Sequence, residues 1–139
     1  ALSLGADGVW VGTRFIATPE ARAVNGYKET LLGTPEDGTV ISRSYTGKTC
    51  RVVRNEWTNH FEQHPEELQP FPNQAIASST AGANHLGAPS GTDVDVSKEF
   101  MPCGQGVGAI HQLIPAGEIV RSMMAEAEAM IDRLVAVRR

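Results

Sequence analysis

The chain has 139 residues, with 12 basic and 16 acidic side chains, so its formal net charge is 12 − 16 = −4. A hydrophobic content of 41% and a charged content of 20% are typical of one globular domain. The mild acidity argues against nucleic acid or an anionic membrane surface as a partner, because binding to either requires concentrated positive charge.

No apolar stretch approaches the roughly 20 residues that span a bilayer, and the first residues do not have the order of a secretory signal. We therefore expect a cytoplasmic protein that does not enter a membrane. In that compartment Cys50 and Cys103 are expected to be reduced thiols, not a disulfide.

The first residues predict the end of a helix and then a buried strand. Residues 1–8 have the pattern of a last helical turn closed by Gly5, a residue that readily adopts the left-handed backbone. Val9 to Val11 form an apolar run between glycines, which is typical of a parallel strand buried on both faces. Such a strand needs neighbours, and the chain offers only one other good candidate, Thr39 to Ser44. We therefore infer that residues 1–139 are the C-terminal part of a larger α/β domain, incomplete at the N-terminus.

The following elements are predicted from capping and turn residues. Thr18 and Pro19 are typical of a helix start, and the segment to Leu32 is expected to form two short helices broken around Asn25-Gly26. A cluster of turn residues at 33–38 separates them from the extended segment Thr39 to Ser44.

The second half of the chain predicts three helices and a loop. Val53, Trp57 and Phe61 recur at helical spacing, which indicates a helix over 52–64. Another helix is expected within 73–83, and a surface loop over 85–97. Pro115 begins a long last helix, whose apolar stripe consists of Ile119, Met123, Met130, Ile131 and Leu134.

The segment with the clearest chemistry is Gly8-Val9-Trp10-Val11-Gly12-Thr13-Arg14-Phe15. A strand that ends in Gly12 and Thr13 suits a phosphate group, because glycine allows close approach to backbone N–H groups and threonine adds a hydroxyl donor. In (β/α)8 barrels, phosphate groups often bind at the loops after the seventh and eighth strands.

Four segments, in order, resemble the nitronate monooxygenase family, formerly called 2-nitropropane dioxygenases. Gly5 to Phe15 looks like the last barrel strand of that family, and Tyr27-Lys28 with Leu31-Leu32 looks like its following helix. Ser42 to Lys48, with Arg51 and Arg54-Asn55, resembles its next segment. Pro102 to Ile110 and Pro115 to Val120 resemble its C-terminal glycine-glutamine turn and closing helix. The resemblance covers essentially the whole chain.

The resemblance implies a fold and a chemistry. The fold would be the last strand and following helices of a TIM (β/α)8 barrel that holds FMN without a covalent bond. The activity would be oxidation of an alkyl nitronate by O2. Val11, Gly12 and Thr13 would bind the FMN phosphate, with Gln105 near the same end of the cofactor. The family's catalytic histidine would lie upstream, so these 139 residues are expected to bind FMN weakly and to be inactive alone.

Two other functions remain open at this stage. A flavin-dependent enoyl-acyl-carrier-protein reductase shares the barrel and a similar phosphate turn but consumes a nicotinamide cofactor. A fragment with only a structural or interaction role is the other. The substrate, NAD(P)H dependence and the presence of a homo-oligomer are not determined by the sequence.

Several polar residues have a functional and a structural interpretation. His60 and His64 are spaced to share a helix face, but without a third ligand we expect no metal site. His111 is interpreted as a hydrogen-bonded structural histidine. Asp93 and Asp95 are interpreted as solvated loop acids, because the glycine and final glutamate of a calcium loop are absent.

Other side chains are expected to serve packing or ion pairing. Cys103 is interpreted as a small buried residue, Trp10 as barrel wall or core, and Trp57 with Phe61 as helix packing. Arg14 suits either a phosphate contact or the capping of carbonyls. A basic cluster is expected to pair with carboxylates and not with nucleic acid; it consists of Lys48, Arg51 and Arg54.

Overall fold

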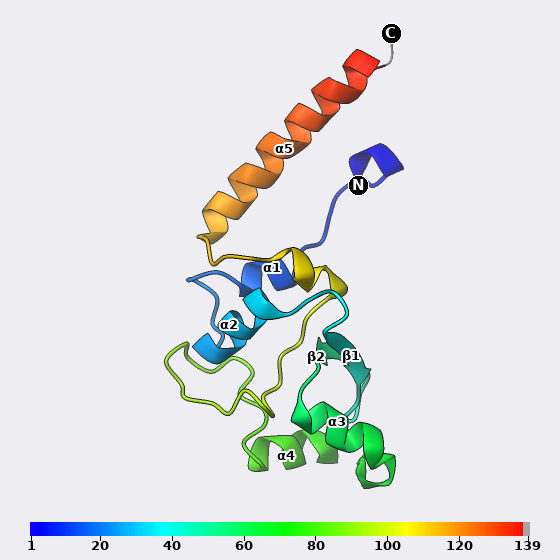
Figure 1. Ribbon diagram of the computed structural model, residues 1–139, viewed down its shortest axis with the longest axis vertical. Coiled ribbons are helices and arrows are strands. Elements are labelled where there is room, and N and C mark those ends of the chain that lie inside the picture. The colour runs from blue at the N-terminus through cyan, green and yellow to red at the C-terminus, as the bar shows by residue number, and fades with distance from the viewer. Residues whose placement is uncertain (138–139) are drawn as a thin grey trace.

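A computed structural model describes residues 1–137 and shows a mixed α/β arrangement (Figure 1). In chain order the elements are η1 Leu2–Leu4, α1 Thr13–Ile16, α2 Asn25–Gly33, β1 Thr39–Ser42, β2 Cys50–Val53, α3 Glu56–Gln63, η2 Pro65–Glu67, α4 Asn73–Thr80, η3 Gln105–Ala109 and α5 Ala116–Val137. Here η denotes a 3₁₀ helix. None of the helices in this range is long and apolar enough to cross a membrane.

The sheet within residues 1–137 is one antiparallel pair, β1 with β2. Its register pairs Thr39 with Val53 and Ser42 with Cys50. The segment after Phe100 adds to the other edge of β2, since Val53 N donates to Met101 O across 3.0 Å. β1 confirms the extended segment expected from Thr39. The helix expected over 52–64 is wrong at its start, because Val52 and Val53 belong to β2 and α3 begins at Glu56.

The N-terminal turn is confirmed, but the strand expected after it is not. η1 ends at Gly5, whose φ is +91°. Val9 to Val11 form no strand, and Trp10 is 99% exposed, so its interpretation as barrel wall or core is wrong for this chain. A parallel strand requires partners for its backbone N–H and C=O groups on a neighbouring strand, and within residues 1–137 no strand pairs with Val9 to Val11.

The helix start expected at Thr18 is also wrong. The Thr18 hydroxyl accepts from Ala21 N across 3.1 Å and donates to Phe15 O across 2.9 Å, so it closes a local turn and not a helix. A single helix, α2, begins at Asn25, the residue where a break was expected.

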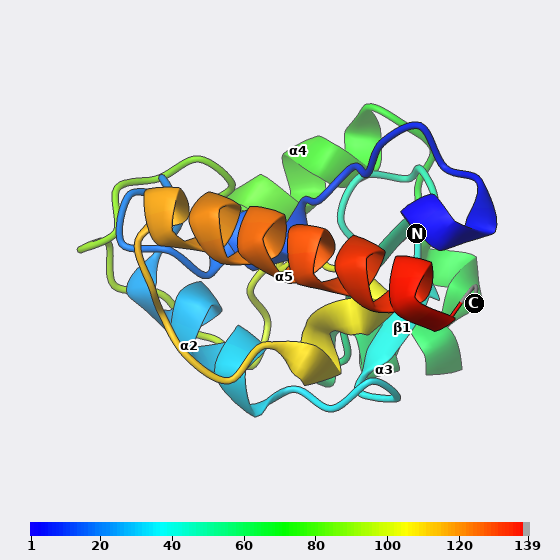
Figure 2. The same ribbon diagram turned by 90° about the horizontal axis from the view of Figure 1, so that it is seen from above.

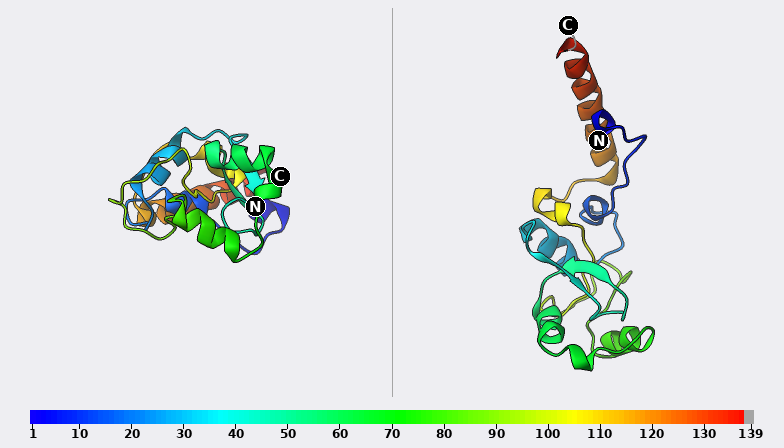
Figure 3. Two further views of the ribbon diagram at one scale, coloured as in Figure 1. Left: turned by 90° about the horizontal axis from the view of Figure 1, so that it is seen from below. Right: turned by 90° about the vertical axis from the view of Figure 1, so that its right-hand side faces the viewer.

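The remaining elements agree with the sequence. α4 lies within the helix expected at 73–83, residues 85–97 form neither helix nor strand, and α5 begins directly after Pro115. Figures 1 and 3 show α5 and the N-terminal segment extending from one end of the molecule, with β1, β2, α3 and α4 at the other. Figure 2 looks down on the first end, where α5 lies across the other elements.

Two adjacent clusters of buried side chains form the core. The larger joins α2 to the segment after Phe100, and it consists of Ala17, Ala23, Val24, Tyr27, Leu31, Val53, Met101, Cys103, Val107 and Ile110. The smaller consists of Tyr45, Val52, Ala83 and Phe100. The larger cluster fixes the start of η3 relative to α1 and α2, and the candidate site lies where η3 meets α1.

Candidate functional site

The turn predicted to bind phosphate lies at the start of α1. Gly12 precedes the helix and is exposed, and a Cβ added to it would meet nothing within 4 Å. Among residues 1–137, no carbonyl accepts from the backbone N–H groups of Gly12, Thr13 or Arg14. The turn therefore has open space around Gly12 and backbone donors that no carbonyl of the described residues occupies.

A second turn, far away in sequence, meets the first one. The backbone N–H of Gly104 donates to Thr13 Oγ1 across 2.9 Å, a contact between residues 91 positions apart. Because a hydroxyl can accept and donate at once, the Thr13 O–H remains available as a donor. Gln105 follows Gly104 as the first residue of η3 and is exposed. The structure thus brings Gly12, Thr13 and the start of η3 together.

Val11 lies beside this turn in an apolar cleft. The cleft has a volume of about 370 Å³ and is lined by Val9, Trp10, Val11 and Phe15 from the N-terminal segment and by Val120, Met123 and Met124 from α5. Val11 therefore stands between the donor-rich turn and an apolar surface. Such a boundary suits a ligand with an anionic end and an aromatic body.

The chemistry available at this place is binding and not acid–base or nucleophilic catalysis. Cys103, directly before Gly104, is 6% exposed, and burial raises the pKa of its thiol to about 11. It is therefore a neutral core residue, as expected. The donors that remain are backbone N–H groups, one hydroxyl and the Gln105 amide, all of which suit phosphate oxygens. These residues fit a phosphate-bearing cofactor.

A comparison with protein families gives a match over most of the chain. Residues 1–126 match the family model described as "Nitronate monooxygenase". The chain belongs to the nitronate monooxygenase family. That family is FMN-dependent and uses nitronates and O2 as substrates.

The curated relatives and the solved structures match this chain over only a part of their own length. Rv1533 of Mycobacterium tuberculosis, whose name places it among the monooxygenases, is 32% identical over 130 residues, which are 91% of this chain and 34% of that protein. A protein of Staphylococcus haemolyticus named "Probable nitronate monooxygenase" is 31% identical over 87 residues, 59% of this chain and 24% of that protein.

Among solved structures, FabK from Thermotoga maritima matches with a TM-score of 0.73 and 25% identity, over 97% of this chain and 41% of that one. The nitroalkane oxidase from Streptomyces ansochromogenes matches with a TM-score of 0.69 and 27% identity, over 94% of this chain and 36% of that one. Both are TIM barrels. The chain therefore spans about a quarter to a third of the length of these curated relatives and corresponds to part of such a barrel.

Arg14 and His111 are the other candidates near the two turns. Arg14 Nη1 donates to Ala17 O at 3.5 Å, which is the capping of a carbonyl expected as one of its two roles. His111 is exposed and makes no hydrogen bond within residues 1–137, so its interpretation as a hydrogen-bonded structural residue is wrong.

The structure confirms the interpretations of the two loop acids and of Trp57. Asp93 and Asp95 are exposed as expected, and hydrogen bonds from Ser97 lower the pKa of Asp95. Trp57 packs on Phe61, with ring centroids 5.2 Å apart, which confirms helix packing.

Within residues 1–137, one member of the basic cluster pairs with a carboxylate. Arg54 binds Glu62 at 2.5 Å. Arg51 donates to the Thr39 hydroxyl, and Lys48 lies 3.9 Å above the centre of the Phe71 ring. The expectation of carboxylate pairing is wrong for these two, because their nearest suitable partners are a hydroxyl and an aromatic face. Cys50 and Cys103 are both free thiols, as expected.

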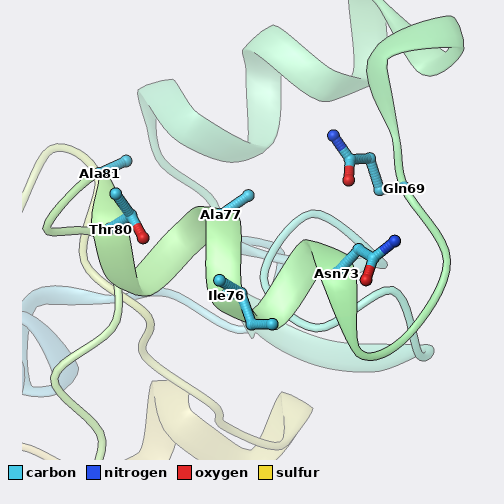
Figure 4. Close-up of a pocket in the computed structure, with 6 residues that line it drawn as sticks. All are labelled: Gln69, Asn73, Ile76, Ala77, Thr80 and Ala81. Atoms are coloured by element: carbon cyan, nitrogen blue, oxygen red, sulfur yellow. The ribbon is translucent and has the colours of Figure 1, made fainter.

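Two features escaped the sequence reasoning. One is a cleft of about 480 Å³ along α4, lined by Gln69, Asn73, Ile76, Ala77, Thr80 and Ala81 (Figure 4). It contains no charged side chain, and neither periodicity nor a motif marks it. The other is the pair Glu66 and Glu67, which lie next to His60 and His64. Their signal was present as the order His-Pro-Glu-Glu, where a proline turns the chain directly after His64.

Proposed function

We propose that residues 1–139 supply the phosphate end of an FMN site in a protein that oxidises alkyl nitronates with O2. The observation that carries the proposal is the hydrogen bond from Gly104 N to Thr13 Oγ1. It joins the two turns that the family resemblance assigns to FMN, although neither turn contains a sequence signal for the other.

The residues of the site have distinct roles in this proposal. Thr13 donates its hydroxyl proton to a phosphate oxygen while its lone pair holds Gly104 in place. Gly12 lets the phosphate approach the backbone, since no neighbouring atom lies within 4 Å of the position of a Cβ. The exposed Gln105 amide donates a further hydrogen bond from the adjacent turn. Hydrogen bonds to a charged acceptor contribute about 1.5–3 kcal/mol each.

The apolar cleft next to Val11 would exclude water from the rest of the cofactor. When bound, FMN supplies the electron transfer between nitronate and O2. This chain's part is to hold and orient it. In this proposal the proton transfers of the reaction belong to the catalytic histidine that the family resemblance places upstream. Alone, residues 1–139 are therefore expected to bind FMN weakly and to show no turnover.

A chimera tests the proposal in a complete barrel. The matched 36% of the Streptomyces ansochromogenes nitroalkane oxidase is replaced by this chain, with junctions placed from the structural match. A purified chimera with the circular dichroism of its host should retain FMN and consume O2 with the nitronate of 2-nitropropane, without NAD(P)H. A folded chimera that contains no flavin would refute the assignment.

The same preparation separates the alternatives. Oxidation of NAD(P)H with an enoyl thioester, and no O2 uptake with the nitronate, would favour the reductase. A chimera that binds FMN no better than a version carrying Thr13→Val and Gln105→Ala would favour a purely structural role for the chain.

A further inference from the structure

We propose that His60, His64, Glu66 and Glu67 form a surface binding site for one divalent transition-metal cation of the Zn²⁺ class. Nothing in the flavin proposal uses these residues. His60 lies on α3, His64 joins α3 to η2, and the two glutamates lie on η2, at the end of the molecule away from α5 (Figure 1). The expectation of no metal site depended on the lack of a third ligand, and the fold supplies two.

The backbone places the four side chains together before any metal binds. His60 and His64 are one helical turn apart, and their ring centroids are 4.9 Å apart. Their spacing is fixed by the hydrogen bond from His64 N to His60 O, 2.9 Å long. Pro65 then begins η2, and Glu67 N donates to His64 O across 3.1 Å. This turn folds the two glutamates back towards the histidines.

The ligand atoms are already close to coordinating distances. His60 Nε2 lies 2.8 Å from Glu67 Oε2, and His64 Nδ1 lies 3.4 Å from Glu66 Oε1. Ligand atoms of His64, Glu66 and Glu67 all lie within 4.8 Å of one another. With bonds of about 2.0–2.2 Å, two ligands on one tetrahedral zinc ion are roughly 3.3 Å apart. His64, Glu66 and Glu67 form the group within that range, and His60 is linked to it through Glu67, so the His60 side chain must rotate to join the other three ligands.

Charge and ligand type favour such an ion. Two carboxylates bring charge −2, and two neutral imidazoles add nitrogen ligands, a set that suits Zn²⁺, Ni²⁺ or Cu²⁺ better than Mg²⁺ or Ca²⁺. Arg54, which precedes α3, is bound to Glu62 at 2.5 Å. The side chains of His60 and Glu67 are 48% and 52% exposed, so an ion has direct access from solvent and room for a water ligand.

A simpler account is that protonated histidines form two surface ion pairs with the glutamates. This account predicts no saturable metal binding. The two accounts differ in one measurement, the titration of the 139-residue chain without an affinity tag with Zn²⁺ by isothermal calorimetry, with Mg²⁺ in a parallel titration.

The expected result is one Zn²⁺ per chain, no Mg²⁺ binding, and at least a tenfold loss of affinity in each of His60→Asn, His64→Asn and Glu67→Gln. His111→Asn is the matched control, because that histidine is also exposed and lies outside the cluster; it should bind as the parent chain does. Circular dichroism should be the same for all variants, since the replaced side chains are exposed. Absence of saturable binding, equal binding by His64→Asn, or loss of binding in His111→Asn would overturn the proposal.

Discussion

Replacement of Thr13 by valine tests whether its hydroxyl contacts the FMN phosphate. Valine has nearly the same shape, so the change removes one oxygen and leaves the packing of α1. In the structure that oxygen accepts from Gly104 N across 2.9 Å. Loss of this bond costs about 0.5–1.5 kcal/mol, because Gly104 is exposed and water can replace part of it.

If the hydroxyl also donates to phosphate, a bond to a charged group is lost as well, which costs a further 1.5–3 kcal/mol or so. The two together amount to about 2–4.5 kcal/mol. At 1.36 kcal/mol for each factor of ten, FMN affinity should fall by roughly 30-fold to 2,000-fold. Riboflavin has the same ring system without the phosphate, so its affinity should fall by only about tenfold at most.

The assay is quenching of flavin fluorescence in the chimera after removal of its cofactor, with FMN and riboflavin titrated in parallel. Thr13→Ser keeps the hydroxyl and should bind FMN within a few-fold of the parent. Thr30→Val is the matched control, because its hydroxyl donates only to Gly26 O within α2. An equal loss for FMN and riboflavin in Thr13→Val would show that the hydroxyl does not contact the phosphate, and no loss for either would refute the role of the Gly104 contact too.

Three further predictions concern the fold. Gly47→Ala should lower the free energy of unfolding by about 1–3 kcal/mol in urea, because φ at Gly47 is +79° and an added Cβ would lie 2.5 Å from Phe71 N. Unchanged stability would contradict the left-handed turn. Asn55→Ala should lower the free energy of unfolding by about 2 kcal/mol in the same assay, because the Asn55 side chain caps α3 and also donates to the Tyr45 hydroxyl. Asn55→Asp should retain the cap, and a loss below about 0.5 kcal/mol in Asn55→Ala would argue against the cap. Burial raises the pKa of Cys103 from 9.0 to about 11, so the stability that the neutral thiol contributes is complete below pH 9 and is lost towards pH 11. The melting temperature of the parent chain should therefore fall more between pH 9 and pH 11 than that of Cys103→Ala. Equal falls in the two proteins would contradict this pH dependence.

The sequence predicts the elements whose signals are local. β1 follows a cluster of turn residues, and α5 follows Pro115 with its apolar stripe, so the local sequence is enough to predict both. β2 was missed because Val53, Trp57 and Phe61 also fit a helical spacing, and only the contact with β1 decides that Val53 is in a strand. Thr18 shows the same limit, since its hydroxyl can cap a helix or close a turn with equal chemistry.

The candidate site divides in the same way. The turn at Gly12 and Thr13 has a composition that suits phosphate, so residue types alone identify it. Its contact with Gly104 joins residues 91 positions apart and cannot be read from periodicity or spacing. The resemblance to a family gave Gln105 its place, and the structure brings its turn next to Thr13. For His60 and His64, the missing information was the path of the chain after Pro65, which places two carboxylates beside them.

The exposed apolar surface links the flavin proposal to the stability of α5. This helix has 22 residues, and Ile119 is its only buried residue in the described chain, while Met130, Ile131 and Leu134 are 45–48% exposed. Helices draw most of their stability from the packing of an apolar face, so α5 gains little from residues 1–115. The same helix forms one wall of the cleft beside Val11. A surface that covers α5 would therefore also order the apolar part of the flavin site. In a complete barrel we expect the stability of α5 and the affinity for FMN to rise together.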